Sequence, residues 1–210
     1  MTKTIIGLLA AELLAVLPAG AESIGKIQVC VDSGNYRSIQ ALMRAKIITT
    51  RMFAGAGVAV EWLRPGSAAC RDAQQTQAIV LEFLPSTPPG LHPGAFAYAR
   101  PYEGEHIVVL LDRIENSVQD TEVPSLLAHV MTHEITHLLE GIARHSQTGV
   151  MKATFDVEDF ELMAHSTLPF APEDLDLIRD GLARRSARAQ IAAPPASAAV
   201  LKSTAVRPRE

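Results

Sequence analysis

The chain of 210 residues has few of the features that mark fibrous or disordered proteins. It contains only 13 glycines and 13 prolines, which excludes a collagen-like sequence, and it has no internal repeat. Charged residues make up 20% and hydrophobic residues 48%, so a wholly disordered chain is excluded as well. The length and composition indicate a globular protein of one domain, or at most two small ones, that buries a sizeable core.

An excess of positive charge is also missing, since the net charge is −4. Residues 184–210 carry six basic side chains and one acidic side chain, and residues 1–21 are balanced, which leaves residues 22–183 with a net charge of −9. A surface of this charge is a poor platform for the phosphates of nucleic acid. We therefore expect no nucleic-acid partner.

Long apolar runs are confined to the N-terminus. Residues 1–21 have a basic residue, Lys3, near their start, then an apolar run over 4–18, and they end with Ala19-Gly20-Ala21. This pattern is typical of a secretory signal peptide. The run is shorter than the roughly 20 residues of a membrane span and contains Glu12. We expect cleavage after Ala21, a secreted or periplasmic protein, and no stable membrane insertion thereafter; an uncleaved anchor is the alternative.

Cysteine is scarce, with only Cys30 and Cys70, and both follow the predicted signal peptide. In an oxidising compartment an even pair is more often bridged than free, which predicts a disulfide. Two separate buried thiols are the alternative.

The apolar pattern predicts an α/β domain over 22–186 with one mixed sheet. The prolines that flank residues 95–100 suit an edge strand. Residues 187–210, rich in alanine, proline and serine, are expected to be a disordered tail. Strands are predicted over 26–31, 58–63, 78–84, 95–100 and 106–111, and helices over 36–53, 121–139, 156–163 and 172–182.

The most informative motif is His133-Glu134-Ile135-Thr136-His137 in the predicted helix 121–139. Residues four apart lie on one helix face, so His133 and His137 can present imidazole nitrogens to one zinc ion. Glu134 follows the first ligand and can act as general base toward a metal-bound water. The same helix carries Leu127, Met131, Ile135 and Leu138 on the side away from the histidines, which predicts separate core and site faces.

Catalytic zinc sites typically use three protein ligands, so another residue must complete the set. Gly141 can end the helix and let the chain turn back, which makes His145 the first candidate. Glu158 and Glu161 on the next predicted helix are the alternatives. His129 lies about 12 Å along the helix from His137, too far for both to bind one ion, and is interpreted as a supporting or core residue.

The stretch from His133 to Ser146, followed by Gly149-Val150-Met151, resembles the zinc signature and Met-turn of the metzincin metallopeptidases. That clan has the pattern H-E-x-x-H-x-x-G-x-x-H and then a methionine in a tight turn beneath the metal. Here Gly141 comes one residue later and His145 two residues later, so the loop before the third ligand is longer. The resemblance spans roughly residues 26–183, and only the zinc helix and the Met-turn are specific.

The resemblance implies a zincin-like fold, in which a mixed twisted sheet with an antiparallel edge strand packs on the active-site helix and a backing helix. It implies a zinc endopeptidase, with Zn²⁺ on His133, His137 and His145, Glu134 as base and Met151 in the turn. A peptide substrate would lie extended along the edge strand that begins at Ala95 and ends at Ala99.

Three points stay open at this stage. Some metzincins have a tyrosine just after the methionine as an oxyanion donor, but Lys152 stands there, and His165 is the remaining candidate. An acidic third ligand, Glu158 or Glu161, would make the arrangement gluzincin-like. A non-catalytic exported zinc-binding domain is the third possibility, although a structural site has no need of the Glu134 carboxylate.

Overall fold

The computed structural model describes residues 23–32, 34, 36, 38–100 and 105–192. The predicted signal peptide, and the predicted tail beyond residue 192, lie outside the described residues.

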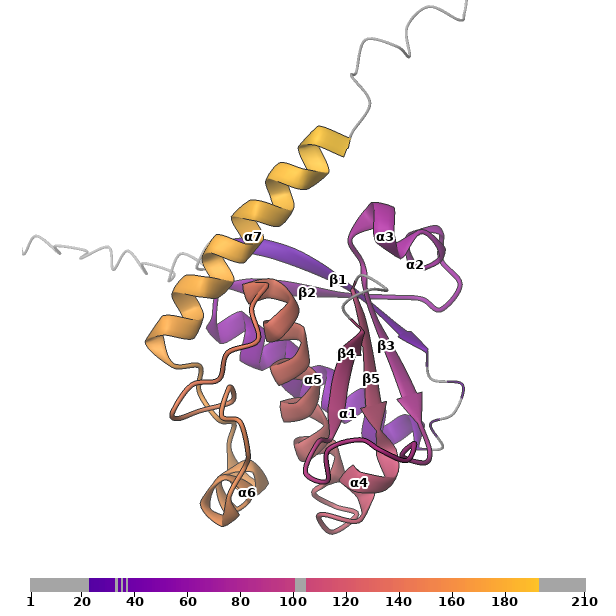
Figure 1. The fold of residues 1–210 in the computed structure, drawn as a ribbon, viewed down its shortest axis with the longest axis vertical. Helices are drawn as coiled ribbons and strands as arrows, with labels where there is room; N and C mark the ends of the chain where they lie inside the picture. The colour runs from indigo at the N-terminus through magenta and orange to yellow at the C-terminus, as the bar shows by residue number, and fades with distance from the viewer. Residues whose placement is uncertain (1–22, 33, 35, 37, 101–104, 193–210) are drawn as a thin grey trace, which may run out of the picture.

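A five-stranded sheet forms the centre of the molecule, in the order β2-β1-β3-β5-β4 (Figure 1). Four strands are parallel, and β4 at one edge runs antiparallel to β5. The mixed α/β fold and the antiparallel edge strand predicted from the sequence are therefore confirmed. The strands are β1 (Gly25–Asp32), β2 (Val58–Leu63), β3 (Ile79–Leu84), β4 (Ala97–Arg100) and β5 (His106–Leu110).

The four predicted helices are present with shifted ends, and three short helices are added. The long and medium helices are α1 (Ile39–Gly55), α5 (Val123–Glu140), α6 (Val157–His165) and α7 (Pro172–Ala192). The short ones are α2 (Ala68–Arg71), α3 (Ala73–Thr76) and α4 (Leu111–Glu115). Four or five residues are too few to show a helical period, which explains why the sequence did not predict them.

Helix α1 buries a different face from the one its largest apolar residues suggest. Ile39, Met43 and Ile47 are 69%, 60% and 51% exposed. The core side is formed instead by smaller and later residues, namely Leu42, Ala45, Thr49, Met52 and Phe53. This face packs against α5, and small residues such as Ala45 allow the two helices to approach closely.

Helix α7 crosses the C-terminal end of α5 and also contacts β1. The contact is very close, because a Cβ atom placed on Gly181 would lie 1.7 Å from the carbonyl oxygen of Leu139. Only glycine permits this approach of the two backbones. The spacing between α5 and α7 therefore depends on Gly181 having no side chain.

The tail prediction needs a correction, because α7 continues to Ala192 and residues 187–192 are helical. The segment from Ser186 to Ala192 contains three alanines and no glycine or proline, so its intrinsic helix propensity is high. This part of α7 projects past the body of the molecule (Figure 1).

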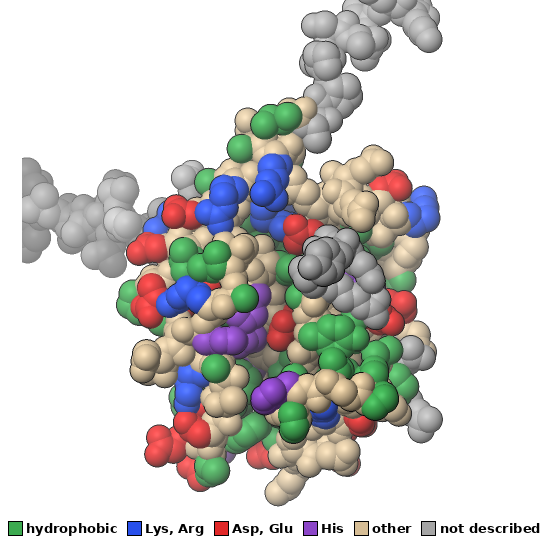
Figure 2. Space-filling model, in the orientation of Figure 1, with side chains coloured by type: hydrophobic (Ala, Val, Ile, Leu, Met, Phe, Trp, Pro, Cys, Tyr) green, Lys and Arg blue, Asp and Glu red, His purple; other side chains and the backbone are tan. Residues whose placement is uncertain are grey.

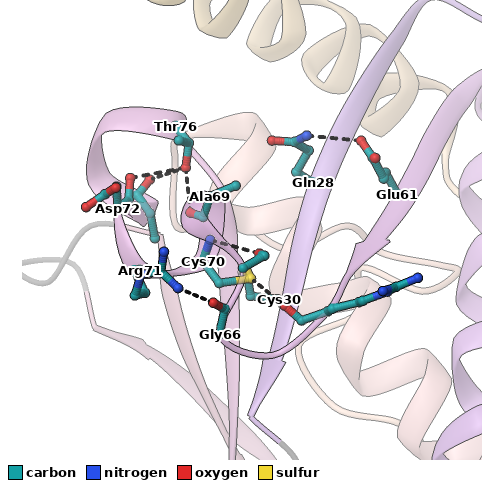
Figure 3. The surroundings of a disulfide bond; sticks show 12 residues. Gln28, Cys30, Glu61, Gly66, Ala69, Cys70, Arg71, Asp72 and Thr76 are labelled. Carbon is teal, nitrogen blue, oxygen red and sulfur yellow. Dashed lines mark hydrogen bonds between the residues drawn. A yellow bond between two sulfur atoms is a disulfide. The ribbon is translucent and has the colours of Figure 1, made fainter.

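The predicted disulfide joins Cys30 and Cys70, with 5.7 Å between their Cα atoms (Figure 3). It ties β1 to α2, and the α2–α3 segment is held further by Thr76, whose hydroxyl donates to the Ala69 carbonyl at 2.8 Å. Nearby, the Gln28 amide donates to Glu61 at 3.0 Å across β1 and β2. The bridge therefore attaches the segment of two short helices, α2 and α3, to the sheet.

Within the described residues, no helix is both long and apolar enough to cross a lipid bilayer.

Candidate metal centre

Helix α5 separates a core face from a site face, as predicted. Leu127, Met131 and Ile135 are fully buried, and Leu138 is partly buried against the core. His133, Glu134 and His137 lie on the other side and line a cavity. The helix ends at Gly141, whose left-handed φ of 71° turns the chain back toward this face.

Three imidazoles converge at the end of this helix. The ligand-type nitrogens of His133, His137 and His145 all lie within 4.8 Å of one another. The two Nε2 atoms of His133 and His137 are 3.0 Å apart. Two nitrogens bound tetrahedrally to one zinc ion at the usual bond length are roughly 3.3 Å apart, so the separation suits a shared metal.

The hydrogen bond of His133 sets which nitrogen is free. Its Nδ1 lies 2.8 Å from the Val150 carbonyl oxygen, which can only accept, so Nδ1 carries the proton. In the neutral ring Nε2 then has a lone pair aimed toward His137. Metal-binding histidines are typically oriented by such a bond to a carbonyl.

Burial favours the neutral imidazoles that a metal requires. It lowers the pKa of His133 to about 4 and also lowers the pKa of His137. Neutral rings with lone pairs facing each other repel, and a divalent cation between them removes that repulsion. The donor set therefore fits zinc.

Glu134 stands directly beside these rings and lines the same cavity. Burial raises the pKa of its carboxyl group to about 7. A carboxylate with a pKa near neutrality is suited to take and return a proton at physiological pH.

The segment from Gly141 to Ser146 positions the third imidazole, that of His145. Between Gly141 and His145 the chain has no regular structure. His145 is exposed, whereas the next residue, Ser146, is 7% exposed, and its backbone N–H donates to the Met151 carbonyl at 2.8 Å. His145 is thus the exposed end of a segment whose following residue is anchored inside the protein.

Met151 is fully buried and lies in a turn that begins at Gly149. The Lys152 N–H donates to the Gly149 carbonyl at 3.3 Å. Gly149 has a φ of 79°, and a Cβ atom there would lie 2.2 Å from the Pro169 carbonyl oxygen. Since the Val150 carbonyl in this turn accepts a hydrogen bond from His133 Nδ1, the turn helps to orient the His133 ring.

A cavity of about 620 Å³ contains the three histidines and Glu134. Figure 2 shows histidine side chains gathered in a hollow on this face, next to an acidic side chain. One wall comes from residues 94–97, which lead into the edge strand β4, and the opposite wall includes the segment from Lys152 to Phe155. Phe160 from α6 completes an apolar part of the lining.

The other candidates lie elsewhere. Glu158 and Glu161 are exposed on α6 and belong to neither the histidine group nor the cavity lining. His165 lines a separate groove beside α1. Lys152 lines the site cavity but is paired with Asp156 and Asp159.

His129 is fully buried, in agreement with its interpretation as a supporting residue. Its Nδ1 donates to the Ser125 carbonyl at 2.7 Å, and its Nε2 accepts from the Leu168 N–H at 3.0 Å. It therefore connects α5 to the segment that precedes α7.

Asp174, a fully buried carboxylate beneath the segment that carries His145, was not predicted from the sequence. It binds Arg144 and Ser146, which lie 30 and 28 residues earlier. Position 174 follows Pro172 at a helix start, where an acidic residue is expected for capping alone. Only the spatial arrangement reveals its second set of contacts.

Comparison with solved structures finds a similar fold in a zinc-dependent peptidase from Methanocorpusculum labreanum. The TM-score is 0.50 at 12% sequence identity, and the match covers 72% of this chain and 99% of that chain. No protein-family model and no curated protein sequence matches this chain. At this identity the likeness concerns the fold, which is thus one that a zinc-dependent peptidase also has.

Proposed function

We propose that this protein is an exported zinc-dependent endopeptidase of metzincin type. His133, His137 and His145 would hold the metal, and Glu134 would be the general base. The observation that carries the proposal is the convergence of three imidazoles beside a half-buried carboxylate in one cavity. A purely structural zinc site would leave the Glu134 carboxylate without a role.

Zinc bound to these residues supplies a Lewis acid that polarises a peptide carbonyl and acidifies a water molecule. Glu134 accepts the proton of the attacking water and passes it to the amine of the leaving peptide. Its raised pKa suits both steps, since the group must bind a proton and release it in each turnover. The Val150 carbonyl keeps the His133 ring in the tautomer that leaves Nε2 free.

The substrate would bind as an extended peptide along the edge strand. β4 pairs with β5 on one side and stands at the end of the strand order. Residues 94–97 line the cavity, so a peptide that adds to this edge has its backbone beside the histidines. The methyl side chains of Ala95 and Ala97 leave room for that approach.

Export would follow from the signal-like residues 1–21 and agrees with the Cys30–Cys70 bridge. Mature protein recovered from the periplasm or the medium is expected to begin at Glu22. Sequencing its N-terminus tests this part of the proposal independently of activity.

The catalytic part is tested with Glu134→Gln. The variant is expected to bind one zinc ion per chain, as the wild-type protein does, and to lose at least about 100-fold in the cleavage of a peptide library. Glu158→Gln, an exposed glutamate on α6, is the control and should keep full activity. If the wild-type protein binds zinc but Glu134→Gln changes nothing on any peptide, the protein is a zinc-binding module.

The ligand set is tested by metal content. His145→Ala should lower zinc affinity strongly, whereas Glu158→Ala and Glu161→Ala should leave it unchanged. The opposite result would support the gluzincin-like alternative, which is disfavoured because both glutamates lie outside the histidine group and its cavity.

A further inference from the structure

We propose that Asp174 is a positioning residue for the third metal ligand, because its buried carboxylate holds both residues that flank His145. The inference rests on the proposed function, in which His145 binds zinc. It deepens that proposal by explaining how a loop longer than the metzincin pattern still delivers an imidazole to the site.

The contacts of Asp174 satisfy both of its oxygens. Oδ1 accepts from Arg144 Nη1 at 2.8 Å and from the Ser146 hydroxyl at 2.5 Å. Oδ2 accepts from the Ala171 N–H at 2.9 Å. Since the residue is fully buried, leaving any of these groups unpaired would be costly, and the arrangement is correspondingly well defined.

Arg144 and Ser146 stand immediately before and after His145. They also touch each other, since Arg144 Nη2 donates to the Ser146 hydroxyl at 3.2 Å. The three side chains form a closed set beneath the exposed imidazole. With both neighbours fixed, the backbone of His145 has little freedom, although its own side chain is exposed.

The charge of Arg144 is balanced on several sides. Its guanidinium lies 3.3 Å from Glu173 and 3.9 Å from the buried Glu140, in addition to the closer contact with Asp174. Glu140 belongs to α5 and the other two carboxylates to α7. The arginine therefore connects the helix that carries two ligands to the helix that backs the third.

The longer loop makes such an anchor necessary. Ile142 and Ala143 are exposed and belong to no helix or strand. A longer irregular segment has more accessible conformations, so holding its end at the metal costs more conformational entropy. The Asp174 contacts supply that constraint from outside the loop.

The test must separate this role from helix capping, because Asp174 also caps α7 through the Ala171 N–H. We would measure zinc affinity by chelator competition for Asp174→Asn, for His145→Ala and for the double variant. Asp174→Asn is expected to weaken zinc binding by about 10- to 100-fold, as is typical of residues that orient metal ligands. In the His145→Ala background the same substitution should have almost no further effect.

The cobalt-substituted protein gives a second readout. Its visible spectrum reports the coordination geometry, and Asp174→Asn should shift it toward that of His145→Ala. Asp176→Asn is the matched control, since it makes the same change on the same helix at an exposed pair with Arg179 and should leave both readouts unchanged. If Asp174→Asn does not fold, Ser146→Ala removes one of the three contacts and leaves the cap intact, with the same expected pattern at a smaller size.

The outcomes distinguish the two proposals. Equal loss of zinc affinity from Asp174→Asn with and without His145 would overturn the positioning role and leave the peptidase proposal standing. A wild-type protein that binds zinc and shows the coupling but cleaves no peptide would support the positioning role and contradict the peptidase. A wild-type protein that binds no zinc overturns both.

Discussion

The two walls of the site are held in different ways. The sheet side is stabilised by apolar packing of strands against α1 and α5 and by the Cys30–Cys70 bridge. The segment between α5 and α7, residues 141–171, contains only α6; besides buried apolar residues such as Met151 and Leu168, it is held by polar contacts. These include Arg144 with Asp174, Lys152 with Asp159, and His129 with the Leu168 N–H.

This difference matches what each wall must do. Apolar packing is nearly non-directional, so it stabilises the fold but tolerates small shifts. Charged hydrogen bonds have short lengths and preferred directions, so they can fix a ligand position closely. The histidines lie where the two meet, with two ligand candidates on the packed helix and the third on the polar segment. Three experiments separate these contributions.

The largest expected effect is on the sheet side. Replacing both cysteines, Cys30→Ala with Cys70→Ala, opens a loop of 40 residues and should lower the free energy of unfolding by about 4 kcal/mol. Zinc affinity of the folded protein should stay within about threefold of wild type. Urea unfolding and chelator competition measure the two quantities, and a parallel loss of zinc affinity would mean that the two walls are not independent.

Gly149→Ala is expected to lower the free energy of unfolding less than removal of the disulfide does. It should lower the zinc affinity more. The added methyl group meets the Pro169 carbonyl, and the positive φ is unfavourable for alanine, so we expect about 3 kcal/mol of destabilisation. The turn must shift, and the Val150 carbonyl that orients His133 shifts with it. Gly55→Ala, with open space around its Cβ position, is the control and should change neither quantity. Unchanged zinc affinity in Gly149→Ala would show that the turn does not support the site.

The smallest effect concerns His129 and pH in the metal-free protein. Burial lowers the pKa of His129 below its ordinary value of 6.5. As pH falls below 6.5 the unfolded chain binds a proton that the folded chain does not, so stability decreases until the folded pKa is reached. His129→Gln should remove about 1 kcal/mol of this decrease per pH unit. Melting temperatures from pH 8 to pH 5 give the slope, and an unaltered slope in the variant would assign the acid sensitivity to other groups.

The sequence predicted the elements that have a regular pattern of apolar residues. Alternating and continuous apolar runs marked all five strands, and Gly141 marked the end of α5. The outward face of α1 was less predictable, because Ile39, Met43 and Ile47 have the spacing of a buried face. Their exposure depends on how α5 packs against the helix, which no local pattern encodes.

The candidate site divides in the same way. His133, Glu134 and His137 have a fixed geometry within one helix, so their spacing alone placed them together. His145 required knowledge of the turn after Gly141, and Asp174 required the position of α7. Contacts between residues about 30 positions apart leave no periodic signal, which is why the supporting carboxylate was found only in the structure.

The close crossing at Gly181 has a practical use in recognising distant relatives. A glycine 36 positions after the third histidine is demanded by backbone geometry and not by chemistry, so it should persist where surface residues diverge. Combined with the histidine motif, it gives a two-part fingerprint for scanning genomes. Chains that carry both parts would be expected to share this helix crossing even when little else in their sequences aligns.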